Sequence, residues 1–455
     1  MKIMARVSDK DFYIPFLIFF FALFLRIAFL FNFGASLIPD SYEYLAYSRT
    51  FSETGTFGDM PLRGPLYPFF LSVCGIFGNE ISLMVIIQIL AGSFVSAGVY
   101  RLSFILSGKR LAGIISGLFF AVNFLEIRLL TSILSDSLFA GLIFLFMFFF
   151  IKFDRHSTIA GALSAGLVLG LSSLIRNSLP GFVLFSAVFI FYGKKDLKNL
   201  RLPVLVFIFT YSLMTVPWMV RNKVRNDFFG ITASAGLNLM THAVNGDYIG
   251  SAVPESVPAV DSLLKDYEDI LNKTVGPRKG MERIDWRKMS IPHETLRKLH
   301  SGSGYSVPEA SALEFDYALS AVFNDPGGYL KASMIELYRI LFVNEEYYPK
   351  AGELAGNLFT DSSLPYYIRS FLRTLISFRG FFIIIFSIIF ILTLPRRREA
   401  FFIVFTVFFS FLVCSFFSTG LTRYKAAAGP LLSCIYGHGI AICYYLCRRR
   451  KSDLP

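Results

Sequence analysis

Apolar residues occur along most of this chain in long continuous blocks, which short polar or basic segments separate. The first block, from Phe12 to Gly34, is long enough to cross a bilayer as a helix. Nine later blocks have the same character, so the pattern predicts ten membrane-spanning helices. Segment 65–78 is apolar but too short to span, and we interpret it as interfacial or re-entrant. The predicted spans are 12–34, 81–105, 111–130, 136–151, 158–175, 179–192, 202–219, 376–394, 400–418 and 426–447.

Composition agrees with this pattern. Of the 455 residues, 54% are hydrophobic and 17% aromatic, with 52 Phe, and the mean hydropathy is +0.57. Soluble domains contain about 45–50% apolar residues and far less Phe. The predicted fold class is therefore an all-α polytopic membrane protein with about ten transmembrane helices.

Basic residues gather in the short segments on one side of the predicted spans. Eighteen Lys and Arg lie there, against three in the short turns on the opposite side, which predicts that both chain ends are cytoplasmic. The net charge of +12 is explained by this bias, so a nucleic-acid partner is not needed. The eighteen are Lys2, Arg6, Lys10, Lys109, Arg110, Lys152, Arg155, Lys194, Lys195, Lys198, Arg201, Arg396, Arg397, Arg398, Arg448, Arg449, Arg450 and Lys451.

Two polar stretches on the outer side divide the chain into three predicted parts. Residues 1–222 form an N-terminal membrane module with a first outer loop at 35–80, and residues 376–455 form the last spans and a basic tail. Residues 223–375 between them carry 19 of the 32 acids and are predicted to form a large extracytoplasmic loop domain. Helices are expected there at 313–323 and 329–343, and loops at 277–280 and 301–304.

Charged residues mark the outer ends of several predicted spans. Asp40 follows the first span and Asp136 opens the fourth. Charges near the hydrocarbon are costly and tend to face a cavity and one another. Acids and cations at one depth therefore predict a site for an anionic headgroup with a general base. The cations on this side are Arg128, Arg176, Arg221, Arg423 and Lys425, and Glu126 is a further acid.

Structural explanations compete with this interpretation. Asp40 followed by Glu43 fits a capping box in which Asp40 caps a helix beginning at Ser41. Asp136 is a candidate cap of the fourth span in the same way. Arg176 and Arg221 also suit the role of interfacial anchors. The functional interpretation is favoured because all of these residues lie on one predicted face of the membrane.

Four elements, in this order along the chain, resemble those of GT-C glycosyltransferases, the polytopic enzymes that include protein O-mannosyltransferases and aminoarabinose lipid A transferases. They cover the whole predicted membrane part. They are Asp40 with Tyr44, Ala46 and the run Arg63-Gly64-Pro65-Leu66-Tyr67-Pro68; Thr131-Ser132-Ile133-Leu134-Ser135-Asp136; Pro217-Trp218-Met219-Val220-Arg221-Asn222; and Arg423-Tyr424-Lys425 with Pro430.

The resemblance implies an enzyme that moves a sugar from a polyprenyl-phosphate to an acceptor hydroxyl, with inversion, on the outer face of the cytoplasmic (inner) membrane. The acceptor is a lipid, a glycan or a protein, and membrane lipids are further partners. Asp40 is the expected general base and Asp136 a second acid. The expected phosphate-binding residues are Arg176, Arg221, Arg423 and Lys425, with Arg63 a weaker candidate. Glu43, Tyr44 and Tyr67 are expected to orient the acceptor.

Two other functions stay open. A lipid-headgroup flippase or transporter would also place charges among spans, although near the bilayer midplane. A polysaccharide polymerase or ligase would use diphosphate-linked glycans instead. Two acids at one site are compatible with a divalent cation, but histidine is scarce there, so no cofactor or metal is predicted.

Overall fold

The protein is described here by a computed structural model, and its described residues are predominantly helical. Within these residues the only β-structure is an isolated parallel bridge between Ser36 and Ser132. The described residues are 9–58, 61–192, 194, 198–253, 256–267, 271, 286–342, 379–395, 397–417 and 422–452.

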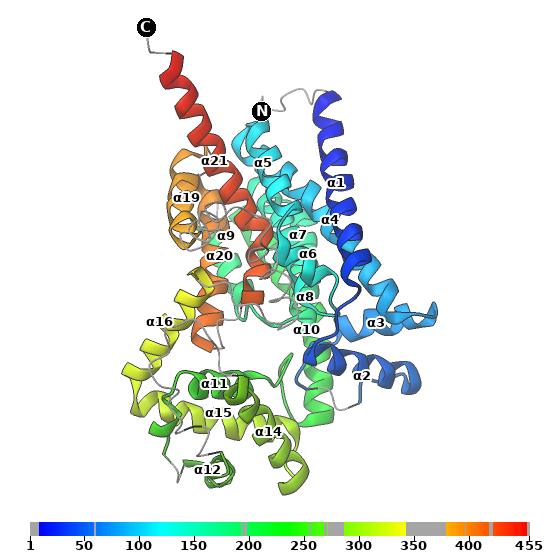
Figure 1. Ribbon diagram of the computed structural model, residues 1–455, viewed down its shortest axis with the longest axis vertical. Helices are drawn as coiled ribbons and strands as arrows, with labels where there is room; N and C mark the ends of the chain where they lie inside the picture. The colour runs from blue at the N-terminus through cyan, green and yellow to red at the C-terminus, as the bar shows by residue number, and fades with distance from the viewer. Residues whose placement is uncertain are drawn as a thin grey trace, which may run out of the picture.

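Six helices are long and apolar enough to cross a membrane, or seven if a bent pair with a 52° angle counts as one span. This supports a multi-pass membrane protein. Figure 1 shows them as a bundle in which the start of α1 and the end of α21 lie at the same end. The six are α1 (Asp9–Phe33), α4 (Glu80–Ser107), α7 (Asp136–His156), α10 (Lys198–Asn226), α20 (Arg397–Phe417) and α21 (Gly429–Ser452), and the bent pair is α5 (Arg110–Ala121) with α6 (Phe124–Leu130).

The remaining apolar helices are shorter. Each predicted span coincides with a helix or with the bent pair, but α8, α9 and α19 are too short to meet the same length standard, so ten spans are not confirmed. Helix α3 coincides with the predicted interfacial segment, and α2 and α3 lie across the ends of the spans (Figure 1). The bounds are α2 (Pro39–Thr54), α3 (Leu66–Ile76), α8 (Ile159–Ile175), α9 (Phe182–Phe191) and α19 (Arg379–Thr393).

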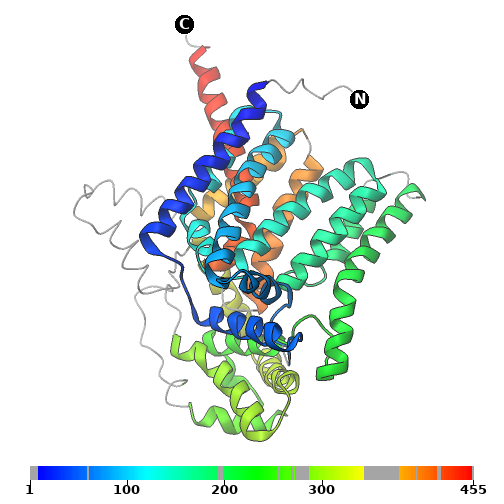
Figure 2. The same ribbon diagram turned by 90° about the vertical axis from the view of Figure 1, so that its right-hand side faces the viewer.

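A cluster of helices lies beyond the opposite end of the bundle from the end of α21, and both views show it (Figures 1 and 2). The helix predicted at 313–323 lies within α15, and the one predicted at 329–343 coincides with α16 up to Phe342, the last described residue there. The loop predicted at 301–304 is wrong, because 301–303 form the last turn of α14 and only Gly304, at φ +75°, leaves the helix. The loop predicted at 277–280 lies outside the described residues, and the division into three parts stays a prediction. The helices are α11 (Ala235–Asn245), η1 (Ile249–Ser251), α12 (Pro258–Lys265), α14 (Trp286–Ser303), α15 (Val307–Asn324) and α16 (Pro326–Phe342).

Aromatic rings fill the centre of the bundle, which accounts for the high Phe content. The rings of Phe150 on α7 and Phe402 on α20 stack with centroids 4.3 Å apart. Helices α8 and α10 approach closely because Gly166 has no side chain. A Cβ at this position would lie only 2.5 Å from the Phe207 carbonyl oxygen. Small residues commonly allow such contacts between helices in a membrane.

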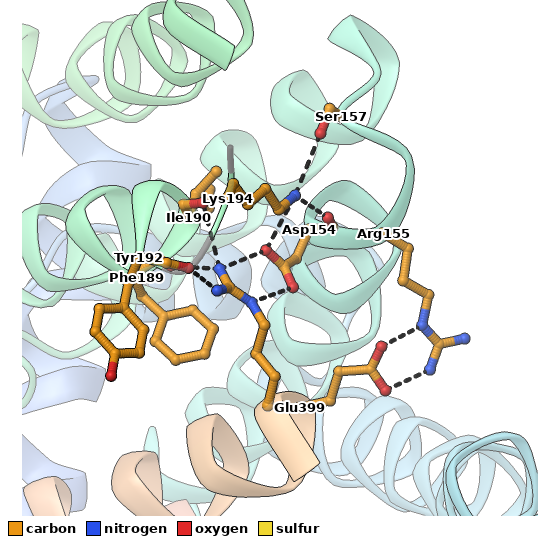
Figure 3. A network of polar contacts seen from close by, with 9 residues as sticks. Asp154, Arg155, Ser157, Phe189, Ile190, Tyr192, Lys194 and Glu399 are labelled. Atoms are coloured by element: carbon orange, nitrogen blue, oxygen red, sulfur yellow. Dashed lines mark hydrogen bonds and ion pairs between the residues drawn. The ribbon is translucent and has the colours of Figure 1, made fainter. Parts of the chain in front are cut away.

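Ion pairs join the helices at the end of the bundle where α7 ends and α20 begins (Figure 3). The Arg398 guanidinium donates from Nε and Nη2 to the two oxygens of Asp154, both at 3.0 Å, and Lys194 lies beside the same carboxylate. Arg155 donates from Nε and Nη2 to Glu399 at 2.6 and 2.7 Å. These bidentate contacts fix α20 against α7.

Candidate functional site

Asp40 lies in the first turn of α2, where the chain continues after the first span. The helix begins at Pro39, whose fixed φ suits a first helical position, and Ile38 is the N-cap. The Ser41 hydroxyl accepts the Ile38 N–H at 3.0 Å. The alternative in which Asp40 caps a helix beginning at Ser41 is therefore wrong, and the Asp40 carboxylate makes contacts outside its helix.

The guanidinium of Arg63 joins the two acids at the start of α2. Its Nη2 donates to Asp40 Oδ1 at 3.1 Å, and its Nε donates to Glu43 Oε2 at 2.6 Å. The same group lies over the Tyr44 ring, 5.5 Å from the centroid. Burial lowers the pKa of Arg63, but Asp40 and Glu43 outweigh it and hold that pKa well above its ordinary value. Arg63 is therefore a permanently charged partner that the two carboxylates share.

Gly64 allows this arginine to approach the membrane bundle. A Cβ at Gly64 would lie 2.2 Å from the carbonyl oxygen of Leu174 on α8, and backbone atoms cannot give way as a flexible side chain can. The next residue, Pro65, is the N-cap of α3. The sequence Arg63-Gly64-Pro65 thus holds a cation close to the end of α8 and starts the following helix.

Asp136 and Arg176 form a second ion pair. Asp136 is the first residue of α7 and Ser135 is the N-cap, so the alternative in which Asp136 is the cap is also wrong. Arg176, just after α8, donates from Nη1 to Asp136 Oδ1 at 2.8 Å and from Nε to Ser178 at 2.8 Å. Asp136 is 4% exposed, and within the described residues its Oδ2 has no hydrogen-bond partner.

The loops that carry Asp40 and Asp136 are tied together. The Ser36 N–H donates to the Thr131 carbonyl at 3.0 Å, and the Ile133 N–H donates to the Ser36 carbonyl at 3.2 Å. The Ser41 hydroxyl donates to the Ile133 carbonyl at 2.8 Å. Two segments about 95 residues apart in sequence are therefore held in one register.

The two predicted tyrosines are both buried beneath these loops. The Tyr44 hydroxyl hydrogen-bonds to the Ser135 hydroxyl at 2.8 Å, and burial raises the pKa of Tyr44, which keeps the phenol neutral. The Tyr67 hydroxyl donates to Gln88 at 2.9 Å, and the Gln88 amide donates to the Ser132 carbonyl at 2.8 Å. Tyr44 lines the cavity described next, whereas Tyr67 supports the loop behind it.

A cavity of about 430 Å³ lies where the ends of the membrane helices meet the cluster formed by α11 to α16. Asp40, Glu43, Arg63 and Arg176 line the membrane side, so the cavity combines two acids with two guanidinium groups. Asn177 and Ser178 lie beside Arg176 on the membrane side. Uncharged polar side chains also line much of the other side, namely Thr232, Ser234, Asn238 and Thr241, together with His293.

Two of the predicted phosphate-binding residues, Arg221 and Lys425, do not line this cavity with Arg176. Arg221 lies over the Trp218 ring, 4.7 Å from the centroid, and donates to the Gly58 carbonyl and to Asn222. Lys425 is half-buried in η3 (Thr422–Ala428), which packs against α7. The side chain of Arg423 lies outside the described part of the chain. Their predicted role in phosphate binding stays a prediction.

Sequence patterns gave no indication of the residues on the far wall. Asn238 and Thr241 lie on α11 and His293 on α14, in helices without a recognisable motif. Asn177 and Ser178, beside Arg176, could have been found from the sequence, because they follow that arginine at the end of a predicted span. Amides and hydroxyls are the groups that hydrogen-bond a sugar. Within the described residues, no group of three or more His, Cys, Asp or Glu is placed to hold a metal ion.

No family model matches this chain, and no curated protein does. Among solved structures, two similar ones are of ArnT from Cupriavidus metallidurans, one bound to undecaprenyl phosphate and one in the apo state. Their identities to this chain are 14% and 16%, and the TM-scores are 0.37 and 0.35. The matches cover 94% and 93% of this chain, and 76% and 75% of the ArnT chains. With TM-scores this low, the similarity assigns neither a family nor an activity.

Proposed function

We propose that this protein is a membrane glycosyltransferase that moves a sugar from a polyprenyl-phosphate donor to an acceptor hydroxyl, with inversion, on the outer face of the cytoplasmic membrane. The acceptor is a lipid, a glycan or a protein. The sequence elements around Asp40, Asp136 and Arg221 support the GT-C class by resemblance. The site needs no cofactor in this proposal, because the transfer is a direct displacement.

The observation that carries the proposal is the lining of the cavity. Asp40 and Arg176 line the same space at the ends of the spans, opposite uncharged amides and hydroxyls. A lipid-linked sugar has an apolar chain, an anionic phosphate and a neutral, hydroxyl-rich ring. These three parts correspond to the bundle, the guanidinium group and the polar wall.

The roles follow from the contacts. The acceptor hydroxyl oxygen attacks the anomeric carbon, and Asp40 accepts the proton that this hydroxyl loses. Arg176 stabilises the phosphate charge that grows as the bond to the sugar breaks. Asp136 is bonded to Arg176 and does not line this cavity, so in our proposal it positions that guanidinium. Arg63 fixes Asp40 and Glu43 in place.

The test is turnover by the purified protein in detergent with a panel of polyprenyl-phosphate sugars. Asp40→Asn keeps the size of the side chain and removes the base, so kcat should fall about 100-fold or more. Arg176→Ala should raise the donor KM about ten- to a hundredfold, because a charged hydrogen bond is lost. Arg49→Ala is the matched control, since Arg49 lies on α2, is 68% exposed and does not line the cavity.

The outcomes separate the steps of the argument. Wild-type turnover by Asp40→Asn would remove Asp40 as the base. An unchanged donor KM in Arg176→Ala would place the phosphate elsewhere, with Arg423 and Lys425 as the next residues to substitute. If no lipid-linked sugar is consumed and labelled lipid instead crosses vesicle membranes, the protein is a transporter.

A further inference from the structure

A second hollow runs along the side of the membrane bundle, between α4 and α7. Its volume is about 1060 Å³, and its walls are almost entirely apolar. One end is formed by Leu66 of α3 and Ile175 of α8, near the Asp40 cavity. The other end is formed by Arg101 of α4 with Arg155 and His156 of α7. We call this hollow the α4–α7 groove.

The groove has the dimensions of a lipid site. On α4 the lining from Ala91 to Arg101 covers about 15 Å at the helical rise per residue. That length is about half of the hydrocarbon thickness of a bilayer, roughly 30 Å, and so matches the depth of one leaflet. Phe94 in its wall is 65% exposed, as expected for a side chain that faces acyl chains.

The end of the groove at Arg101 and Arg155 is basic, and no acidic side chain in the described part of its lining neutralises these charges. Among the described residues no carboxylate lines the groove. Arg101 is exposed and makes no ion pair or hydrogen bond to the described residues. Arg155 uses Nε and Nη2 for Glu399, and its third nitrogen points away from that carboxylate (Figure 3). At this end of the groove a ligand can therefore contact the whole Arg101 guanidinium and the remaining nitrogen of Arg155.

We propose that the α4–α7 groove binds an anionic phospholipid of the surrounding leaflet, with its acyl chains along the apolar walls and its phosphate at Arg101. Basic pockets between membrane helices are suited to anionic headgroups. The cations lie at the end of the groove away from the Asp40 cavity. The phospholipid whose phosphate lies at Arg101 therefore belongs to the leaflet opposite the one next to the Asp40 cavity. The site is therefore separate from the donor phosphate site and does not depend on the proposed enzyme activity.

The experiment is native mass spectrometry of the purified protein, titrated with phosphatidylglycerol and, separately, with phosphatidylcholine. The wild type should retain phosphatidylglycerol about fivefold more tightly, and Arg101→Ala should remove the difference. Arg101→Lys should keep part of it, because the charge remains. Lys152→Ala is the matched control. Lys152 is exposed near the end of α7 that carries Arg155 and His156, but it does not line the groove.

A second variant tests the apolar walls without changing charge. Gly141 lines the groove, and a Cβ there meets only Val95 at an ordinary 3.5 Å, so the longer side chain of Gly141→Leu extends into the hollow. This variant should lose retention of both lipids at least severalfold, with its melting temperature in detergent near that of the wild type.

Three results would overturn the proposal. Equal retention of the two lipids by the wild type would show that no anionic headgroup is recognised. Equal losses in Arg101→Ala and Lys152→Ala would show attraction by the whole basic surface. Displacement of phosphatidylglycerol by undecaprenyl phosphate, one molecule for one, would assign the groove to the polyprenyl chain. Each readout is lipid retention, so none depends on turnover.

Discussion

Removal of the Arg63 charge is the sharpest test of the electrostatics around Asp40. Arg63 lies 3.1 Å from Asp40 and 2.6 Å from Glu43, and its side chain is only 22% exposed. At an effective dielectric constant of 20, two charges about 4 Å apart interact with about 4 kcal/mol. Solvent reaches part of the cluster, so we expect the lower part of the range of one to three pH units that is typical of an adjacent opposite charge.

Arg63→Gln should therefore move the acidic limb of the pH–rate profile. With the cation gone, the Asp40 carboxylate loses its opposite charge, so its active ionised form requires a higher pH. We expect the acidic limb to rise by about one to two pH units, with most of the lost rate recovered above the new limb. The assay is kcat/KM with a polyprenyl-phosphate sugar from pH 5 to pH 9.

The control for this prediction is Arg49→Gln. Arg49 lies on α2, as Asp40 and Glu43 do, and its distance to Glu80 is 3.7 Å, but it is 68% exposed. Its pH–rate profile should superimpose on that of the wild type. A loss in Arg63→Gln that is uniform across the pH range would refute the electrostatic reasoning and assign Arg63 a packing role.

Three further predictions concern stability. Asp136→Ala and Arg176→Ala should each destabilise the protein by about 3 kcal/mol, because each leaves a buried charge unpaired, and the double variant should cost clearly less than the sum in a denaturation cycle. Gly64→Ala should cost about 1–3 kcal/mol because its Cβ would meet the backbone of Leu174, whereas Gly302→Ala, which has nothing within 4 Å, should be neutral or stabilising by melting temperature. Burial lowers the pKa of His242 to about 4, although its hydrogen bond to the Ser415 carbonyl opposes this shift. The unfolded state therefore binds the proton first as the pH falls below the ordinary value, and stability should decrease by roughly 2 kcal/mol between pH 7 and pH 5 in the wild type but not in His242→Gln.

The apolar pattern predicted the positions of the membrane helices well but not their lengths. The run at 136–151 becomes α7, Asp136–His156, whereas 179–192 yields only the ten residues of α9, Phe182–Phe191. Pro180 and Gly181 precede α9, and Gly181 has φ +72°, which a continuous helix does not allow. Hydrophobicity alone carries no information on where such a backbone constraint interrupts a run.

The site was predictable on one side. Asp40 and Arg176 stood out because charges beside a span are costly, whereas Arg63 was a weaker candidate that came from the resemblance. The structure brings all three to one cavity. Whether the Asp40 carboxylate caps its helix or contacts other parts of the chain was not predictable, since it depends on whether the helix begins at Pro39 or at Ser41. Asn238 and His293 were not predictable at all, because only tertiary packing brings them to residues some 200 positions earlier.

The bridge between Ser36 and Ser132 has a consequence for how this protein can diversify. The distance between the two acid-bearing loops is set by backbone hydrogen bonds, which tolerate most changes of side chain. The opposite wall is carried by α11 and α14, which belong to a separate hydrophobic cluster. Mutations in that wall can therefore accumulate, and alter which molecules fit, while the acids and their arginines keep their spacing. Paralogues of this chain should differ most along α11 and α14 and least at Asp40, Asp136 and the arginines that pair with them.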